Sequence, residues 1–204
     1  MNIIGIDIGS LTTKVALVQD GTVADTLMKR STYNFKKVGK ELFSELLIKH
    51  DIRQEDLDSI ISTGYGRHSI PDLATDQITE ISAHARGVQH FFPDVRSIID
   101  IGGQDSKVIV ISKRSGKVLD FQMNDKCAAG TGRFLEVMAS ALEVDIDDFG
   151  DLALKSNNPL TISSMCTVFA ESEVISLFAQ GQAKEDIALG IHESIAKRVG
   201  GMAK

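Results

Sequence analysis

The sequence lacks the features that mark membrane, secreted and nucleic-acid-binding proteins. It contains no run of about 18 apolar residues, so no segment is suited to span a membrane as a helix. Its N-terminus enters an apolar strand pattern without the basic region and cleavage site of a signal peptide. The formal net charge is -6 and no strong basic run occurs, which argues against nucleic acid as a partner. We therefore expect a cytoplasmic protein that binds neither membrane nor nucleic acid.

Cysteine is scarce, with only Cys127 and Cys166 in 204 residues. The cytoplasm keeps thiols reduced, so metal binding or catalysis competes with simple burial more strongly than a disulfide does. The two cysteines are far apart in the sequence, and no histidine or further cysteine is spaced nearby to complete a zinc site. On residue type alone, burial of both side chains in a core is the simplest interpretation.

An internal repeat dominates the organisation of the chain. Hydrophobic residues make up 43% of it, which is enough for a core and indicates one domain or two small lobes. Ile6 to Val15 and Ile99 to Val108 both read I-D-I-G-x-x-x-x-K-V without a gap. In each copy an apolar strand ends near an aspartate, a turn of small polar residues follows, and a second strand returns. We therefore predict a duplicated unit with lobes at 1–93 and 94–204.

Strand and helix patterns alternate around the two repeats. In each repeat a tight turn, Asp20-Gly21 or Ser115-Gly116, leads to a third strand. Hairpins alternating with helices predict an α/β fold with mixed sheets, flanking helices and a nucleotide cleft between two lobes. The expected strands are Asn2–Ile8, Lys14–Gln19, Ser97–Ile101 and Lys107–Ser112, and the expected helices are Val38–His50, Thr75–Phe92, Arg133–Leu142, Glu171–Ala179 and Lys184–Lys204.

The turn of the first repeat, Asp7–Lys14, has the composition of a phosphate-binding loop. Gly9 allows close backbone approach, and the hydroxyls and backbone N–H groups around it suit phosphate oxygens. Lys14 adds positive charge, whereas Asp7 would repel phosphate and instead suits a hydrated Mg²⁺. The predicted nucleotide-binding residues here are Gly9, Ser10, Leu11, Thr12, Thr13 and Lys14, with Asp7 in a catalytic role.

The turn of the second repeat, Asp100–Lys107, offers a similar set of groups. Gln104 and Asp105 could position a water molecule or the metal's hydration shell, and we predict a catalytic role for both. The predicted nucleotide-binding residues here are Asp100, Gly102, Gly103, Gln104 and Lys107. Two tight turns without a ligand are the alternative, but a repeated aspartate at a strand end is costly to bury unless it is paired. The pattern is neither a P-loop nor a G-x-G-x-x-G fingerprint.

Two strings carry a resemblance to a known superfamily. IGIDIGSLTTKVALV (4–18) and IIDIGGQDSKVIVI (98–111) resemble the two phosphate motifs of the sugar-kinase, actin and heat-shock-chaperone superfamily. This resemblance implies duplicated actin/hexokinase-like lobes of ribonuclease H-like topology. It also implies ATP or ADP bound with Mg²⁺.

The cysteine strings resemble a narrower family. NDKCAAGTGRF (124–134) and CTVFAESEVISL (166–177) are similar to the ATP-dependent activators of 2-hydroxyacyl-CoA dehydratases, as is STGYGR (62–67). An iron–sulfur cluster generally needs four thiolates, and a twofold dimer of this chain would supply four. The resemblance implies that Cys127 and Cys166 of two subunits hold one bridging 4Fe–4S cluster. We also assign Gly130, Thr131 and Gly132 to the nucleotide-binding set.

The resemblance further implies a homodimeric electron-transfer ATPase. Such a protein would receive an electron from a ferredoxin or flavodoxin and deliver it to the dehydratase. It also implies a further strand and a glycine-rich, adenosine-contacting motif after Lys204, so we expect this chain to be a fragment. The alternatives are the ATPase subunit of a benzoyl-CoA-type reductase, a sugar or carboxylate kinase without a cluster, and an actin-like or chaperone-like ATPase. The roles of Arg133, Glu171 and Glu173 stay open.

Overall fold

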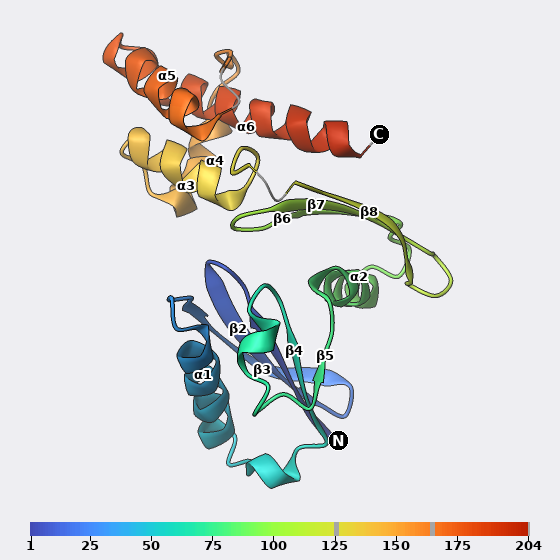
Figure 1. The fold of residues 1–204 in the computed structure, drawn as a ribbon. Helices are drawn as coiled ribbons and strands as arrows, with labels where there is room; N and C mark the ends of the chain where they lie inside the picture. Colours follow the sequence, from blue (N-terminus) through green and yellow to red (C-terminus); the bar gives the residue numbers. More distant parts are fainter. Residues whose placement is uncertain (125–126, 164–165, 204) are drawn as a thin grey trace. The chain divides into compact units, whose positions relative to one another are not determined.

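The computed structural model describes residues 1–124, 127–163 and 166–203 (Figure 1). The chain divides into two compact units. The first comprises Met1–Asp94 with Arg114–Lys117, and the second comprises Val95–Lys113 with Val118–Lys204. Among the described residues, no helix combines the length and the apolar composition needed to cross a membrane.

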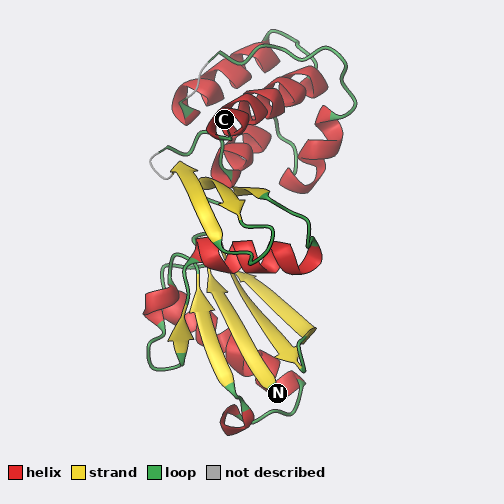
Figure 2. Ribbon diagram, turned by 90° about the vertical axis from the view of Figure 1, so that its right-hand side faces the viewer, coloured by secondary structure: helices red, strands yellow, loops and turns green. Residues whose placement is uncertain are grey.

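The first unit is built on a five-stranded mixed sheet. Its strand order is β3-β2-β1-β4-β5, with β1, β2 and β3 antiparallel and with β4 and β5 added in parallel. Figures 1 and 2 show α1 lying along one face of this sheet. The elements are β1 (Asn2–Ile8), β2 (Thr12–Gln19), β3 (Thr22–Arg30), α1 (Phe35–Lys49), η1 (Gln54–Asp56), β4 (Ser59–Thr63), η2 (Arg67–Ser69), β5 (Asp76–Gln77) and α2 (Glu80–Phe91).

Alternation along the strands and helical spacing along α1 build the core of the first unit. Ile4, Ile6 and Ile8 of β1 are fully buried, because every second side chain of a strand points to the same face. Leu42 and Leu46 of α1, one turn apart, are also fully buried in the same cluster. The helix starts where the Asn34 side chain accepts a hydrogen bond from the Lys37 backbone N–H at 3.0 Å.

Within its described residues, the second unit combines a three-stranded antiparallel sheet with four helices. The strand order is β6-β7-β8, and α6 contacts β7. The helices share one apolar core that includes Phe134, Met138, Phe149, Ala170 and Ile191. The elements are β6 (Ser97–Ile101), β7 (Ser106–Ile111), β8 (Val118–Asn124), α3 (Gly132–Ala141), α4 (Ile146–Ala153), α5 (Thr167–Ala179) and α6 (Lys184–Met202).

The two sequence repeats form equivalent hairpins. Asp7 pairs with Lys14 in the antiparallel register of β1 and β2, and Asp100 pairs with Lys107 in that of β6 and β7. Each hairpin continues into the predicted third strand. The alternating pattern therefore predicted these four strands to within two residues at each end.

Helix α1 begins at Phe35, three residues before the predicted Val38, and two other predicted helices have larger errors at their starts. The helix expected from Thr75 begins only at Glu80, because Asp76 and Gln77 pair in parallel with β4 and Thr79 caps the helix through a hydrogen bond from the Ser82 N–H. The helix expected from Glu171 begins at Thr167, directly after Cys166. Helix α4 was not predicted, and the end of the predicted helix at Lys204 lies outside the described residues.

Candidate functional site

The first turn is closed by its own backbone and braced from β3. The Gly9 N–H donates to the Thr12 carbonyl at 3.0 Å, and a Cβ at Gly9 would lie 2.7 Å from that oxygen. The hydroxyl of Ser31, which follows β3, donates to the Gly9 carbonyl at 2.7 Å and lies 2.9 Å from the Thr13 hydroxyl. Thr13 is fully buried, so its hydroxyl supports the turn from inside. A nucleotide contact from Thr13 stays a prediction.

Asp7 and Lys14 form a partly exposed ion pair at this turn. Lys14 Nζ lies 3.2 Å from Asp7 Oδ2, and the two side chains are 50% and 28% exposed. An exposed pair of this kind contributes less than about 1 kcal/mol, so either partner can exchange it for a ligand at small cost. The geometry leaves the Lys14 ammonium and the Asp7 carboxylate available for a phosphate and a hydrated cation.

The structure adds residues at and after the end of β4 that the site prediction did not include. Thr63 is the parallel-sheet partner of Asp7, so both side chains lie on the same face at the same end of the sheet. The Thr63 hydroxyl oxygen is buried and has no hydrogen-bond partner among the described residues. A buried hydroxyl without a partner is uncommon and calls for a bound water or ligand.

Gly64 completes this edge of the site. Its φ of +85° favours glycine, and a Cβ there would lie 2.4 Å from Asp7 Oδ1 and 2.6 Å from the Ile8 carbonyl oxygen. The Gly66 N–H donates to the same Ile8 carbonyl at 2.8 Å. The STGYGR string therefore packs directly against the Asp7 carboxylate. Its small residues after a short apolar strand were the signal in the sequence.

The second turn has the same backbone closure but a different charge arrangement. The Gly102 N–H donates to the Asp105 carbonyl at 2.8 Å. Lys107 is only 1% exposed, and its Nζ lies 2.6 Å from Asp105 Oδ1 and 3.4 Å from Asp100 Oδ2. Two carboxylates thus offset the burial of one ammonium. Gln104 at the tip of the turn is exposed.

Gly130, Thr131 and Gly132 connect the second turn to α3. The Gly132 N–H donates to the Gly102 carbonyl at 2.8 Å, and the Arg133 N–H donates to the Gly103 carbonyl at 2.9 Å. Thr131 is fully buried, and its hydroxyl donates to the Ala128 carbonyl at 2.6 Å. These donors are engaged within the second unit, so direct nucleotide contact by the three residues stays a prediction.

Both cysteines lie in the second unit, each before a helix that enters the same core. Cys127 is half-buried, packs against that core and precedes α3. Cys166 is exposed and is the N-cap residue of α5, whose first turn carries no acidic side chain. The partial positive charge at a helix N-terminus stabilises a thiolate, so the position of Cys166 suits a metal ligand.

The residues whose roles were open now have neighbours. Glu173 accepts two hydrogen bonds at 2.9 Å from the backbone N–H and the hydroxyl of Ser163, which ties α5 to the segment before Cys166. Arg133 forms a surface ion pair with Glu136 at 3.0 Å. Glu171 is half-buried at the start of α5.

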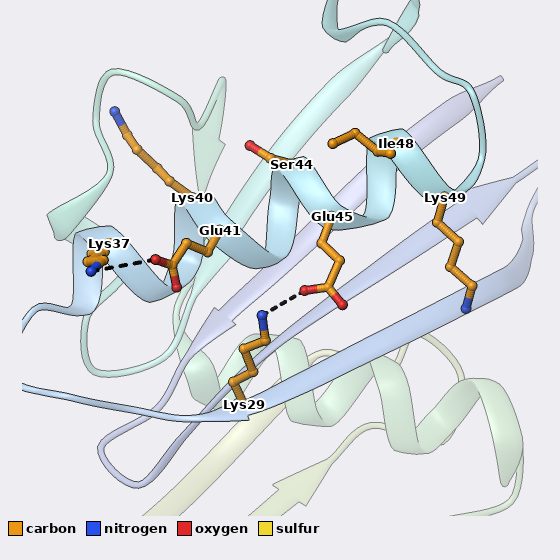
Figure 3. A pocket seen from close by; sticks show the side chains of 8 residues that line it. All are labelled: Lys29, Lys37, Lys40, Glu41, Ser44, Glu45, Ile48 and Lys49. Atoms are coloured by element: carbon orange, nitrogen blue, oxygen red, sulfur yellow. Dashed lines mark hydrogen bonds and ion pairs between the residues drawn. The ribbon is translucent and has the colours of Figure 1, made fainter.

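An open groove between β3 and α1 lies elsewhere on the first unit (Figure 3). Its lysines are paired: Lys29 with Glu45 at 2.6 Å and Lys37 with Glu41 at 3.8 Å. A hydrogen bond from Lys40 lowers the pKa of the neighbouring Asp72 to about 2. The lining includes none of the predicted site residues, so the groove is a network of surface ion pairs. Its lining residues are Lys29, Lys37, Lys40, Glu41, Ser44, Glu45, Ile48 and Lys49.

Comparison with known proteins decides the family. A sequence profile of the BadF/BadG/BcrA/BcrD ATPase family matches residues 4–204. The chain belongs to this ATPase family. It is 47% identical over 202 residues to the (R)-2-hydroxyglutaryl-CoA dehydratase activating ATPase of Acidaminococcus fermentans, and the match covers 98% of this chain and 76% of that protein.

Further similarities extend to a crystal structure and to a component of a reductase. The activator of the 2-hydroxyisocaproyl-CoA dehydratase from Clostridium difficile with bound ADPNP is 45% identical, with a TM-score of 0.92. That match covers 100% of this chain and 75% of the other. One subunit of the benzoyl-CoA reductase of Thauera aromatica is 33% identical over 98% of this chain and 72% of its own length. The predicted actin-like α/β fold and the predicted family are confirmed.

Proposed function

We propose that this chain is the ATP-hydrolysing, iron–sulfur activator of a 2-hydroxyacyl-CoA dehydratase. In this role it accepts one electron from a ferredoxin or flavodoxin and passes it at low potential to the dehydratase, while water cleaves ATP to ADP and phosphate. The observation that carries the proposal is the placement of both cysteines before helices in the unit that also holds the second turn. The similarity to two dehydratase activators supports the choice of partner.

Each turn would contribute to nucleotide binding from its own lobe, with the lobes at 1–93 and 94–204. Backbone N–H groups around Gly9 and Gly103, together with the Lys14 ammonium, would bind phosphate oxygens. The Asp7 carboxylate would accept hydrogen bonds from water bound to Mg²⁺, an arrangement that suits a strongly hydrated cation. The unpartnered Thr63 hydroxyl beside Asp7 fits the same hydrated cation, because it can donate to or accept from a bound water.

The two thiols fit half of a cluster site. When bound, a 4Fe–4S cluster supplies one-electron redox chemistry. Cys127 and Cys166 would provide two thiolates, and a second copy of the chain would provide the other two across a twofold axis. The N-terminal end of α5 would lower the cost of placing negative charge beside Cys166. We further propose that the homodimer works in the cytoplasm.

A second candidate is the ATPase component of a reductase that acts on benzoyl-CoA. The 33% identity to the Thauera aromatica benzoyl-CoA reductase component favours it, although the identity to the dehydratase activator is higher at 47%. Both candidates use the same cysteines and turns. Electron transfer to a purified 2-hydroxyacyl-CoA dehydratase, measured against a benzoyl-CoA reductase core complex, distinguishes them.

The decisive experiment is iron and sulfide analysis of anaerobically purified protein, together with its mass in solution. We expect a brown dimer with about four iron atoms per two chains. Cys127→Ser and Cys166→Ser should each lose the iron and its broad absorbance. Both variants should still bind ATP, because the first turn lies in the other unit. A colourless wild-type protein that hydrolyses ATP, or variants that keep their iron, would overturn the proposal.

A further inference from the structure

We propose that Asn124 is a positioning residue that fastens the cysteine loop, Cys127–Thr131, to β8 of the second sheet. Through this attachment a movement of the second turn would reach Cys127. The inference rests on the proposed function and deepens it, because it names the residues that couple nucleotide binding to the cysteine. Neither Asn124 nor its neighbour Ser106 belongs to the predicted nucleotide-binding or metal-binding set.

The Asn124 amide holds the loop by two hydrogen bonds. Asn124 is the last residue of β8, and its Nδ2 donates to the Cys127 carbonyl at 3.0 Å and to the Ala129 carbonyl at 3.1 Å. Both protons of one amide group are therefore used on the same short loop. Because one acceptor is the carbonyl of Cys127 itself, the amide controls the backbone that carries this thiol.

A cross-strand neighbour holds the same loop. Ser106 is the antiparallel partner of Asn124 in the β7–β8 register, so the two side chains lie on the same face of the sheet. The Ser106 hydroxyl is buried and donates to the Gly130 carbonyl. Gly130 has a φ of +83°, and a Cβ there would lie 3.0 Å from Arg198 Cδ, so α6 closes over the loop at this point.

The start of α3 attaches to the second turn as well. The carbonyls of Gly102 and Gly103 accept the N–H groups of Gly132 and Arg133, the first two residues of the helix. A Cβ at Gly132 would lie 3.3 Å from the Gly102 oxygen, which leaves little room for a side chain. Two hydrogen bonds thus join the second turn to α3, and three more join β7 and β8 to the cysteine loop.

This connection has a physical consequence for coupling. A nucleotide phosphate that displaces Gly102 or Gly103 would also displace the first N–H groups of α3, because these N–H groups donate to the carbonyls of the two glycines. The Ser106 hydroxyl on β7 and the Asn124 amide on β8 would carry the same displacement to the carbonyls around Cys127. By linkage, a nucleotide effect on the cysteine requires an equal effect of the cysteine's state on nucleotide affinity.

Asn124→Asp tests the inference with almost no change in shape. The carboxylate cannot donate to the Cys127 and Ala129 carbonyls and instead repels them, so the loop is released. The matched control is Gln122→Glu, which makes the same chemical change at an exposed position two residues earlier on β8.

Two measurements report the coupling between nucleotide binding and Cys127. The first is the shift in the midpoint potential and the electron paramagnetic resonance spectrum when ADP is replaced by a non-hydrolysable ATP analogue in the iron-loaded dimer. The second is the effect of that analogue on alkylation of Cys127 in chelator-treated protein, located by mass spectrometry. The coupling factor is the ratio by which the analogue changes the property measured at the cluster or at Cys127. We expect Asn124→Asp to reduce this factor by at least about fivefold, with ATP affinity of the iron-free protein unchanged. Gln122→Glu should match the wild type.

Each outcome decides the inference separately from the proposed function. A wild-type protein without iron defeats the proposed function, and the alkylation measurement still tests the attachment. Unchanged coupling in Asn124→Asp, or alkylation of wild-type Cys127 that no nucleotide alters, overturns the inference. If Asn124→Asp does not fold, Ser106→Ala with the exposed Ser97→Ala as its control carries the same test, with the same outcomes expected.

Discussion

The two hairpin turns have the same backbone hydrogen bonding, but their charged side chains differ in burial and in partners. Asp7 pairs with Lys14, and Asp100 pairs with Lys107, in the same register and with the same closing hydrogen bond. In the first turn the lysine side chain is 50% exposed and faces one carboxylate. In the second turn the lysine is 1% exposed and contacts two carboxylates.

A single position accounts for much of this difference. Asp105 in the second repeat stands where the first repeat has Thr12. The added carboxylate holds the Lys107 ammonium in place, whereas the Lys14 ammonium is free to leave its partner. The duplication therefore preserved the backbone of the turn and changed which charges are available to a ligand.

Replacing the lysine of each turn should give the largest measurable difference between the two turns. Lys107→Met leaves the carboxylates of Asp100 and Asp105 without their buried cationic partner. We expect this change to lower the free energy of unfolding by about 3 kcal/mol. Lys14→Met removes an exposed pair and should cost less than about 1 kcal/mol. Urea unfolding of both variants measures the difference. Equal losses would mean that the two lysines have equivalent environments.

Thr63 sharpens the comparison, because only the first turn has this buried and unpartnered hydroxyl beside its aspartate among the described residues. Thr63→Val keeps the shape and removes the hydroxyl. We expect about tenfold weaker binding of Mg²⁺ and ATP, or about 1.4 kcal/mol, with no loss of stability in the free protein. Calorimetric titration measures the affinity. Thr26→Val on β3 is the exposed control, and an equal effect in that variant would contradict a specific role.

Asp25 gives the smallest expected effect and is the reverse of Lys107, since one carboxylate faces two nitrogen groups, the Lys49 ammonium and the His50 ring. Hydrogen bonds from Lys49 and then His50 hold the pKa of Asp25 well below its usual value of 3.8. A carboxyl group whose pKa is lower in the folded state than in the unfolded state stabilises the fold at pH values above the unfolded-state pKa. For Asp25 this contribution is lost progressively as the pH falls below about 3.8.

Asp25→Asn should therefore lower the stability near neutral pH and remove part of the loss on acidification. Thermal unfolding followed between pH 7 and about pH 2 measures both effects. Asp51→Asn is the control, because Asp51 directly follows Lys49 and His50 at the C-terminal end of α1. A stability profile for Asp25→Asn that is parallel to the wild type throughout acidification would show that the pairing has no energetic consequence.

Local patterns in the sequence predicted a large part of the fold. Alternating apolar residues predicted the strands of both hairpins, and helical spacing predicted α1, α3 and α6 to within about three residues at each end. The two-residue strand β5 was missed, because nothing in Asp76 and Gln77 themselves favours a strand. Its existence depends on parallel pairing with β4, which is a contact between separate segments.

For the site, the sequence by itself determined which residues lie at the two turns and that each cysteine precedes a helix. Backbone periodicity and turn chemistry act over a few residues, so a single segment contains this information. Only the tertiary structure decided that Gly64 packs against Asp7, that Lys107 is enclosed, and that Asn124 holds the cysteine loop. Gly64 and Asp7 are far apart in the chain, and they meet because β4 pairs with β1. Lys107 and Asn124 contact residues close to them in sequence, but the burial and direction of these side chains depend on how β6, β7 and β8 pair and pack.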